Sequence, residues 1–252
     1  MKYFFLVFLF ALGFWGCSSS YDTSSMYPSQ RYHFALKLYN NRNYEDALKE
    51  FQAIVLQYPG STIVDSAQYY LGQTRFQRDE YILAAYEYSR LIKNMPASKL
   101  VTECQYMLAE CYYNLSPDYS LDQKYTLKAI QELQAFIDFF PADPKVPDAE
   151  HKIAELNEKL AHKAYYTAYI YTKLEYFNAA LIYDDEVIET YHDTHYATLA
   201  FYDKAKLLVQ LKRNTDALDC ISKFIDKYPD DPRVKELENI KTSIEDKISD
   251  VK

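Results

Sequence analysis

Glycine is scarce in this sequence. Only four of its 252 residues are glycine, and Gly13 and Gly16 both lie close to the N-terminus. Phosphate-cradling loops and nucleotide-binding turns need clustered glycines, because the backbone must approach the ligand closely. Gly60 and Gly72 stand alone, and the Gly-x-Ser-x-Gly motif of many hydrolases is absent. We therefore expect no nucleotide site, no cofactor and no catalysis.

Positive charge is also in short supply. The chain has 28 Lys and Arg against 36 Asp and Glu, for a net charge of −8, and no segment is rich in Lys or Arg. A nucleic-acid partner is disfavoured, because such proteins bind by neutralising phosphates. With 49% hydrophobic and 25% charged residues the composition is that of a globular protein, which excludes disorder of the whole chain. Tyrosine is abundant, at 27 residues.

The N-terminus has the features of an export signal. Lys2 precedes an apolar run from Tyr3 to Trp15, which has the length of a secretory signal rather than of a spanning helix. The following Gly16, Cys17 and serines resemble the lipobox of bacterial lipoproteins, although Phe14 and Trp15 depart from its usual residues. We predict a signal peptide over 1–16 and a lipidated Cys17 with a flexible tether over 17–29. An ordinary signal peptide with an incidental cysteine, or an uncleaved anchor, is the alternative.

Internal repeats dominate the rest of the chain. An alanine recurs, and twelve residues after it stands a proline in four of five copies; the alanines are Ala47, Ala84, Ala129, Ala180 and Ala217, followed by Pro59, Pro96, Pro141, His192 and Pro229. Two residues further on are Ser61, Ser98, Asp143, Thr194 and Asp231, all good helix N-caps. Small residues also recur twelve positions before four of the alanines, at Ala35, Gly72, Ala168 and Ala205, and Ala109 fits the third copy once an eight-residue insertion is allowed. Each copy therefore predicts two closely packed antiparallel helices.

This pattern resembles the tetratricopeptide repeat. It predicts an all-α fold, a right-handed α-solenoid of about five tetratricopeptide-like helix pairs over 30–232, with a C-terminal capping helix over 233–252. The second helices carry apolar stripes at helical spacing, such as Phe51, Ile54 and Val55, which we interpret as core. The segment 116–123 is predicted to be a loop inserted in the third copy. A stretch without Pro or Gly from Asp148 to Lys173 predicts one long helix.

An aromatic row marks the first helices. The residue three positions before the small residue is tyrosine in every copy: Tyr32, Tyr69, Tyr106, Tyr165 and Tyr202. Seven residues further along, two turns up the same helix face, the first three copies have Tyr39, Phe76 and Tyr113. We call these eight residues the aromatic row. It predicts either a groove for an extended, partly apolar peptide or ring packing between neighbouring first helices, and both roles are compatible.

The remaining polar features predict no reactive site. Cys104, Cys111 and Cys220 are expected to be buried thiols, with a bond from Cys220 to either of the others left open. His192 and His195 lie in a connection between repeats, where their spacing does not hold them on one helix face, so we expect no metal site. The acidic run from Asp184 to Glu186 is interpreted as a solvated helix face.

Together, the lipobox, tether, repeats and long helix resemble the BamD-type lipoprotein family of outer-membrane β-barrel assembly. The segments that carry this resemblance are 44–47, 57–61, 122–129, 136–141, 153–161 and 168–180; His192 in place of proline departs from the pattern. The resemblance implies a scaffold anchored in the outer membrane and facing the periplasm. It also implies binding to the POTRA domains of an Omp85-type barrel through C-terminal repeats, and to C-terminal segments of unfolded outer-membrane proteins through N-terminal repeats.

Two other functions fit the same architecture. A periplasmic tetratricopeptide adaptor lipoprotein of cell-wall or division machinery shares the anchor and the repeats. A lipoprotein that captures small nutrients is less favoured, because no closed polar pocket is indicated by the sequence. Identifying the protein partner distinguishes the first alternative from barrel assembly.

Overall fold

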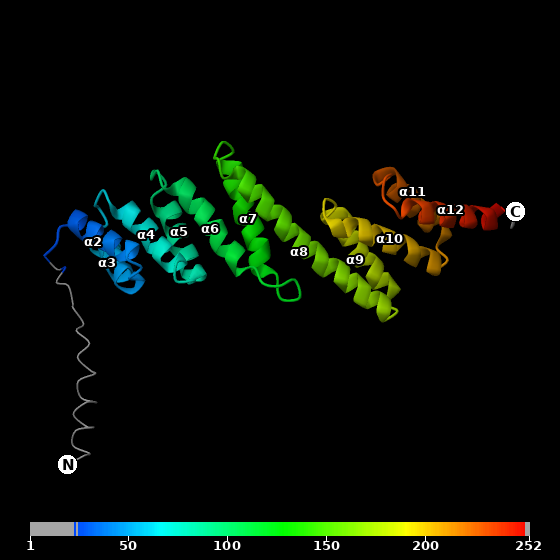
Figure 1. The fold of residues 1–252 in the computed structure, drawn as a ribbon, viewed down its shortest axis with the longest axis horizontal. Helices are drawn as coiled ribbons and strands as arrows, with labels where there is room; N and C mark the ends of the chain where they lie inside the picture. Colours follow the sequence, from blue (N-terminus) through cyan, green and yellow to red (C-terminus); the bar gives the residue numbers. More distant parts are fainter. Residues whose placement is uncertain (1–22, 24, 250–252) are drawn as a thin grey trace, which may run out of the picture. The chain divides into compact units, whose positions relative to one another are not determined.

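A computed structural model describes residue 23 and residues 25–249. These residues form eleven α-helices and no strand (Figure 1), which confirms the predicted all-α class. The helices are α2 (Pro28–Asn40), α3 (Tyr44–Gln57), α4 (Val64–Phe76), α5 (Tyr81–Asn94), α6 (Val101–Leu115), α7 (Lys124–Phe139), α8 (Val146–Lys173), α9 (Phe177–Thr190), α10 (His195–Gln210), α11 (Asn214–Lys227) and α12 (Val234–Ser249).

The chain divides into two compact units, 1–71 and 72–252, with the boundary inside α4. In the first unit, α2 packs on α3 around Ala35, Ala47, Phe51 and Ile54, none of which is exposed. In the second unit, consecutive helices pack on each other from α5 to α12. Apart from α4, which the boundary divides, each helix therefore packs on a helix next to it in sequence, which is the organisation of a helical repeat protein.

The recurring small residues lie in the core. All ten are buried, including the five anchor alanines at 0% exposure. Gly72 shows why size matters here, because a Cβ atom on it would lie 2.7 Å from a ring carbon of the fully buried Tyr88. The four prolines stand two residues beyond the ends of α3, α5, α7 and α11, where the missing amide and fixed φ prevent the helix from continuing.

Four repeats share one tight turn between their two helices. Its central residue has a left-handed backbone in each: Arg42, Asp79, Glu175 and Lys212, with φ between 58° and 62°. The next amide donates to the carbonyl five residues earlier, for example Asn43 to Leu38 at 2.9 Å. This Schellman-type bond satisfies a carbonyl that the helix end leaves free. The third repeat lacks the turn because residues 116–123 form the predicted inserted loop.

The predicted N-caps are wrong in position. Helices α6 and α8 begin three residues after Ser98 and Asp143, and their N-cap residues are Leu100 and Lys145. Instead, the Asp143 carboxylate accepts from the Lys145 amide at 2.9 Å, and Asp231 accepts from Arg233 at 2.9 Å. These side chains thus stabilise a turn that leads into the helix, since Asp and Ser bond readily to an amide two residues on. Only Thr194 occupies an N-cap, and its hydroxyl donates backwards to Tyr191.

Candidate functional site

In the first unit, the aromatic row is part of a ring cluster. Tyr32 and Tyr39 each meet Tyr70 edge to face, with ring centroids 6.1 and 5.4 Å away, and Tyr70 stacks on Phe51 at 5.6 Å. Burial, followed by the neighbouring Tyr70, raises the pKa of Tyr32 to about 12, against the effect of a hydrogen bond with Ser66. Tyr69 also contacts Tyr70, with the two ring centroids 5.3 Å apart. Tyr70, which has no place in the predicted row, is the hub of this cluster.

In the second unit, the tyrosine hydroxyls of the row cross to the next first helix. Tyr113 on α6 donates to Glu155 on α8 at 2.6 Å, and Tyr106 on α6 donates to Asp148 on α8. The two tyrosines are seven residues apart and so are the two carboxylates, which means that α6 and α8 run in register along this seam. Phe76 has no hydroxyl, and its ring packs on Tyr81 of α5 at 5.1 Å.

The same bond recurs in the later repeats. Tyr165 on α8 donates to Asp203 on α10 at 2.7 Å, and Tyr202 on α10 donates to Glu236 on α12 at 2.7 Å. Burial and the acceptor Asp203 both raise the pKa of Tyr165, so the phenol stays protonated and keeps donating. All eight members of the row are half-buried. The geometry of the row therefore includes the inter-helix packing that the sequence offered as one role, and four of its tyrosines, Tyr106, Tyr113, Tyr165 and Tyr202, donate to a carboxylate.

Sequence reasoning missed the four acceptors, although a signal for them exists. Asp148 and Glu155 each follow their tyrosine by 42 residues, and Asp203 and Glu236 follow theirs by 38 and 34. These offsets are close to the length of one repeat or of one repeat with its insertion. Searching for acids one repeat length after each tyrosine of the row would have found them.

A half-buried lysine links α6 and α8 along this seam. Lys152 lies between Tyr106 and Tyr113, at 5.3 Å from each ring centroid, and donates to the Tyr106 hydroxyl at 2.9 Å. It also pairs with Asp148 at 2.8 Å and with Glu110, while its own side chain is only 15% exposed. Burial alone would lower the pKa of Lys152, but hydrogen bonds to the two carboxylates outweigh it and raise the pKa. The seam therefore joins one lysine to two carboxyl groups and a tyrosine hydroxyl.

Replacing Tyr165 by phenylalanine tests the inter-helix bond. The change keeps the ring and removes only the donor to Asp203, so we expect the free energy of unfolding in urea to fall by about 1 kcal/mol. Tyr169→Phe is the matched control, because Tyr169 lies on the same helix and its side chain is 48% exposed. Unchanged stability in Tyr165→Phe would show that the hydroxyl bond does not hold the repeats together.

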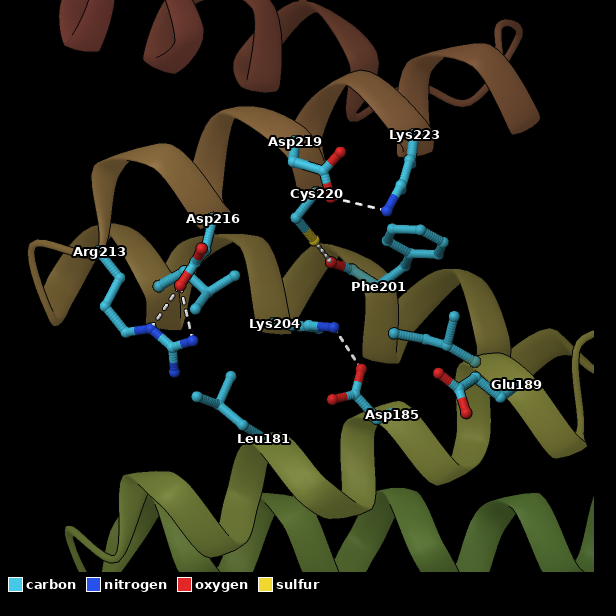
Figure 2. A pocket seen from close by; sticks show the side chains of 12 residues that line it. Leu181, Asp185, Glu189, Phe201, Lys204, Arg213, Asp216, Asp219, Cys220 and Lys223 are labelled. Atoms are coloured by element: carbon cyan, nitrogen blue, oxygen red, sulfur yellow. Dashed lines mark hydrogen bonds and ion pairs between the residues drawn. The ribbon is translucent and has the colours of Figure 1, made fainter.

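A charged cleft lies between α9, α10 and α11, with a volume of about 340 Å³ (Figure 2). Its cations face acids of the same cleft. Arg213 bonds Asp216 at 2.6 Å, Lys223 bonds Asp219 at 2.7 Å, and Lys204 pairs with Asp185. The cleft therefore offers little unbalanced charge to a ligand.

A second cavity, of about 290 Å³, lies between α8, α9 and α10. Asp184 of α9 lines it and is only 2% exposed, so the interpretation of the acidic run as a solvated face is wrong for this residue. The α9 face that carries Asp184 turns inward because Ala180 and Val187, one turn to either side, are themselves buried. Burial, then the charges of Asp203 and Asp185, raise the pKa of Asp184 to about 8.

The cysteines and histidines form no reactive cluster in the part of the chain that the structure describes. Cys104, Cys111 and Cys220 are free and buried, and burial raises the pKa of Cys220 to about 11. The bond from Cys220 that the sequence left open is not present. His192 lies beside Asp193, and no group of three potential metal ligands occurs between residues 25 and 249.

Several exposed apolar side chains lie along the C-terminal half of α8, in the turn after it and on α9. Tyr166, Tyr169, Ile170 and Leu174 follow one another at helical spacing along α8 and its end, and are 41% to 57% exposed. Tyr176 and Ile182 add to them at 63% and 67%. We call these six residues the α8–α9 apolar patch. The sequence pattern did not indicate this patch, because α8 carries apolar residues on its buried stripe and on the opposite face as well.

None of the described helices combines the length and the hydropathy that crossing a membrane would require. Cys17 and the predicted signal peptide lie outside the described residues.

Comparison with known proteins identifies the family. Residues 24–217 match the family model YfiO, described as outer membrane lipoprotein. A curated relative, the outer membrane protein assembly factor BamD of Rickettsia prowazekii (strain Madrid E), is 25% identical over 216 residues, which cover 85% of this chain and 86% of the relative.

Among solved structures, a thermophilic tetratricopeptide-repeat protein of Thermus thermophilus is 18% identical with a TM-score of 0.36, covering 86% of this chain and 98% of that one. A tetratricopeptide-repeat protein of Parabacteroides merdae ATCC 43184 is 14% identical with a TM-score of 0.38, covering 87% and 74%. Because the family model spans more than half of the sequence, the chain belongs to the YfiO family of outer membrane lipoproteins.

Proposed function

We propose that the chain is a non-catalytic scaffold lipoprotein of outer-membrane β-barrel protein assembly. The observation that carries this proposal is the family match over residues 24–217, together with a relative named as an assembly factor. The fold supports it, because stacked helix pairs present long side-chain surfaces for protein partners. In this proposal Cys17 carries the lipid that anchors the chain in the outer membrane, and the repeats face the periplasm.

In this proposal each of the two partners binds a different surface of the chain. The α8–α9 apolar patch belongs to the C-terminal repeats and contacts the POTRA domains of an Omp85-type barrel, because exposed aromatic and aliphatic side chains of this kind are typical of protein interfaces. The aromatic row of the first three repeats takes C-terminal segments of unfolded outer-membrane proteins. Its half-buried rings offer large contact areas that need little further ordering.

The test is affinity capture through a C-terminal tag after gentle detergent extraction, with mass spectrometry of the recovered proteins. We expect stoichiometric recovery of an Omp85-type barrel. Recovery of cell-wall or division enzymes without that barrel would contradict the proposal and favour an adaptor of those machineries.

A pair of variants tests the assigned surface in the same experiment. Leu174→Asp places a charge in the α8–α9 apolar patch and is expected to reduce barrel recovery at least several-fold, since burying an unpaired charge is costly. Leu127→Asp on α7 is the matched control, because the two leucines are 57% and 56% exposed. Equal recovery with both variants would remove the patch from the proposed interface.

A further inference from the structure

The cavity between α8, α9 and α10 contains a carboxyl group without a partner. Asp184 is 2% exposed, and among the described residues no hydrogen bond or ion pair reaches its side chain. Buried carboxyl groups are normally paired, because burial without a partner costs several kcal/mol. The next residue in sequence, Asp185, differs from Asp184 because it pairs with Lys204 in the neighbouring cleft (Figure 2).

Two cations, Lys206 and Lys173, line this cavity, and each also contacts another side chain. Lys206 bonds the Tyr202 hydroxyl at 3.0 Å and Glu236 at 3.2 Å, and Lys173 lies over the Tyr169 ring at 5.1 Å. Asp203, which also lines the cavity, accepts the Tyr165 hydroxyl at 2.7 Å, and this neutral donor does not cancel the charge of a carboxylate. The cavity thus contains two acids, and among the described residues neither forms an ion pair, although the charge of Lys204 acts on Asp184 and that of Arg233 acts on Asp203.

The shape of the cavity suits one long side chain. Its volume of about 290 Å³ is several times that of one water molecule in the liquid, about 30 Å³. Ala168, Leu207 and the ring of Tyr169 supply apolar wall beside the two carboxyl groups. An aliphatic stem that ends in a positive charge matches this combination of apolar wall and buried acid.

We propose that this cavity is a binding pocket for a cationic side chain, arginine or lysine, of a protein partner, with Asp184 and Asp203 receiving the charge. This inference rests on the proposed scaffold function and specifies the kind of partner side chain that contacts this cavity. Arginine is the better fit, because its planar group can bond both carboxylates at once.

Binding should depend on pH through Asp184. The groups that face it are Tyr165 and Lys173 from α8, Asp185 from its own helix, and Asp203, Lys204 and Lys206 from α10. Its raised pKa of about 8 means that the acid is largely protonated near neutral pH when the pocket is empty. A bound cation favours the ionised form, so affinity should rise as the pH increases toward 9.

The experiment uses the full lipidated chain in detergent, labelled with ¹³C in the aspartate carboxyl groups and observed by NMR. The probes are three acetylated, amidated tripeptides: Ala-Arg-Ala, its citrulline analogue, which is nearly isosteric and uncharged, and Ala-Glu-Ala. We expect the arginine peptide alone to bind and to lower the pKa of Asp184. Binding of the glutamate peptide, or equal binding of the citrulline peptide, would overturn the proposal, as would no binding by any of the three.

Two variants complete the test. Asp184→Asn should reduce affinity for the arginine peptide about tenfold or more, whereas Glu186→Gln, which changes an exposed acid on the same helix, should leave it unchanged. Asp184→Asn should also fold well, because it removes a buried unpaired acid; its melting temperature should exceed that of the parent, and by more at pH 9 than at pH 5. Loss of binding in both variants would overturn the assignment to Asp184. Because the peptides are defined, failure here is distinct from failure to capture the barrel.

Discussion

Replacing Phe136 by alanine should lower the free energy of unfolding by about 3 to 5 kcal/mol. Phe136 lies on α7 at 0% exposure and packs against Tyr106 at 5.3 Å and Phe140 at 5.8 Å. The truncation leaves a cavity. Because helix packing holds the neighbouring side chains on both sides, they cannot move far enough to fill it. Urea unfolding followed by circular dichroism measures the change.

The control for this substitution lies on the same helix. Phe139→Ala removes an equally large ring that is 74% exposed, and it should cost less than about 1 kcal/mol. If the two variants unfolded at the same urea concentration, Phe136 would not be part of a packed core, and the repeat interpretation of α7 would fail with it.

Replacing Lys152 by methionine should cost about 2 to 3 kcal/mol. The stem keeps most of its volume, but Glu110 and Asp148 lose their shared cation, and the Glu110 side chain is only 15% exposed. Lys49→Met is the matched control. Lys49 also pairs with two carboxylates, Glu45 and Asp46, yet it is 61% exposed, and its loss should cost less than about 1 kcal/mol. Equal losses would mean that burial adds nothing to the Lys152 network.

Lowering the pH should weaken the same network around Lys152. Hydrogen bonds from Lys152 and then from Tyr106 lower the pKa of Asp148 below its ordinary value of 3.8. A carboxyl with a lowered folded pKa contributes stability above its unfolded pKa, and this contribution is lost as the pH falls through the folded pKa. We expect the stability difference between the parent and Lys152→Met to shrink below pH 4 for this reason. A difference independent of pH would show that the ion pair with Asp148 contributes nothing.

The fold was predictable because packing in a repeat protein is local. Small residues such as Ala47 and Ala129 recur at a fixed register, and each is fully buried. Helix starts were less predictable, since Asp143 and Asp231 act through a turn that only the backbone path reveals.

The candidate sites were only partly predictable for a different reason. Tyrosines at one register, such as Tyr106 and Tyr165, are visible in a single sequence, but their acceptors lie in the next repeat at offsets that insertions alter. The burial of Asp184 was hidden as well. In sequence it is one of three successive acids, and only the packing of α9 against α8 and α10 separates it from Asp185 and Glu186.

The length of α8 has a mechanical consequence. This helix has 28 residues and extends about 42 Å at ~1.5 Å per residue. Its neighbours are α7 along one part and α9 along another, so two repeats share one rod. A force that separates these two repeats therefore acts on the continuous backbone hydrogen bonds of one helix. No linker between them can extend first. We expect single-molecule stretching to release repeats three and four in one event, whereas the last repeat, joined by short turns, yields separately.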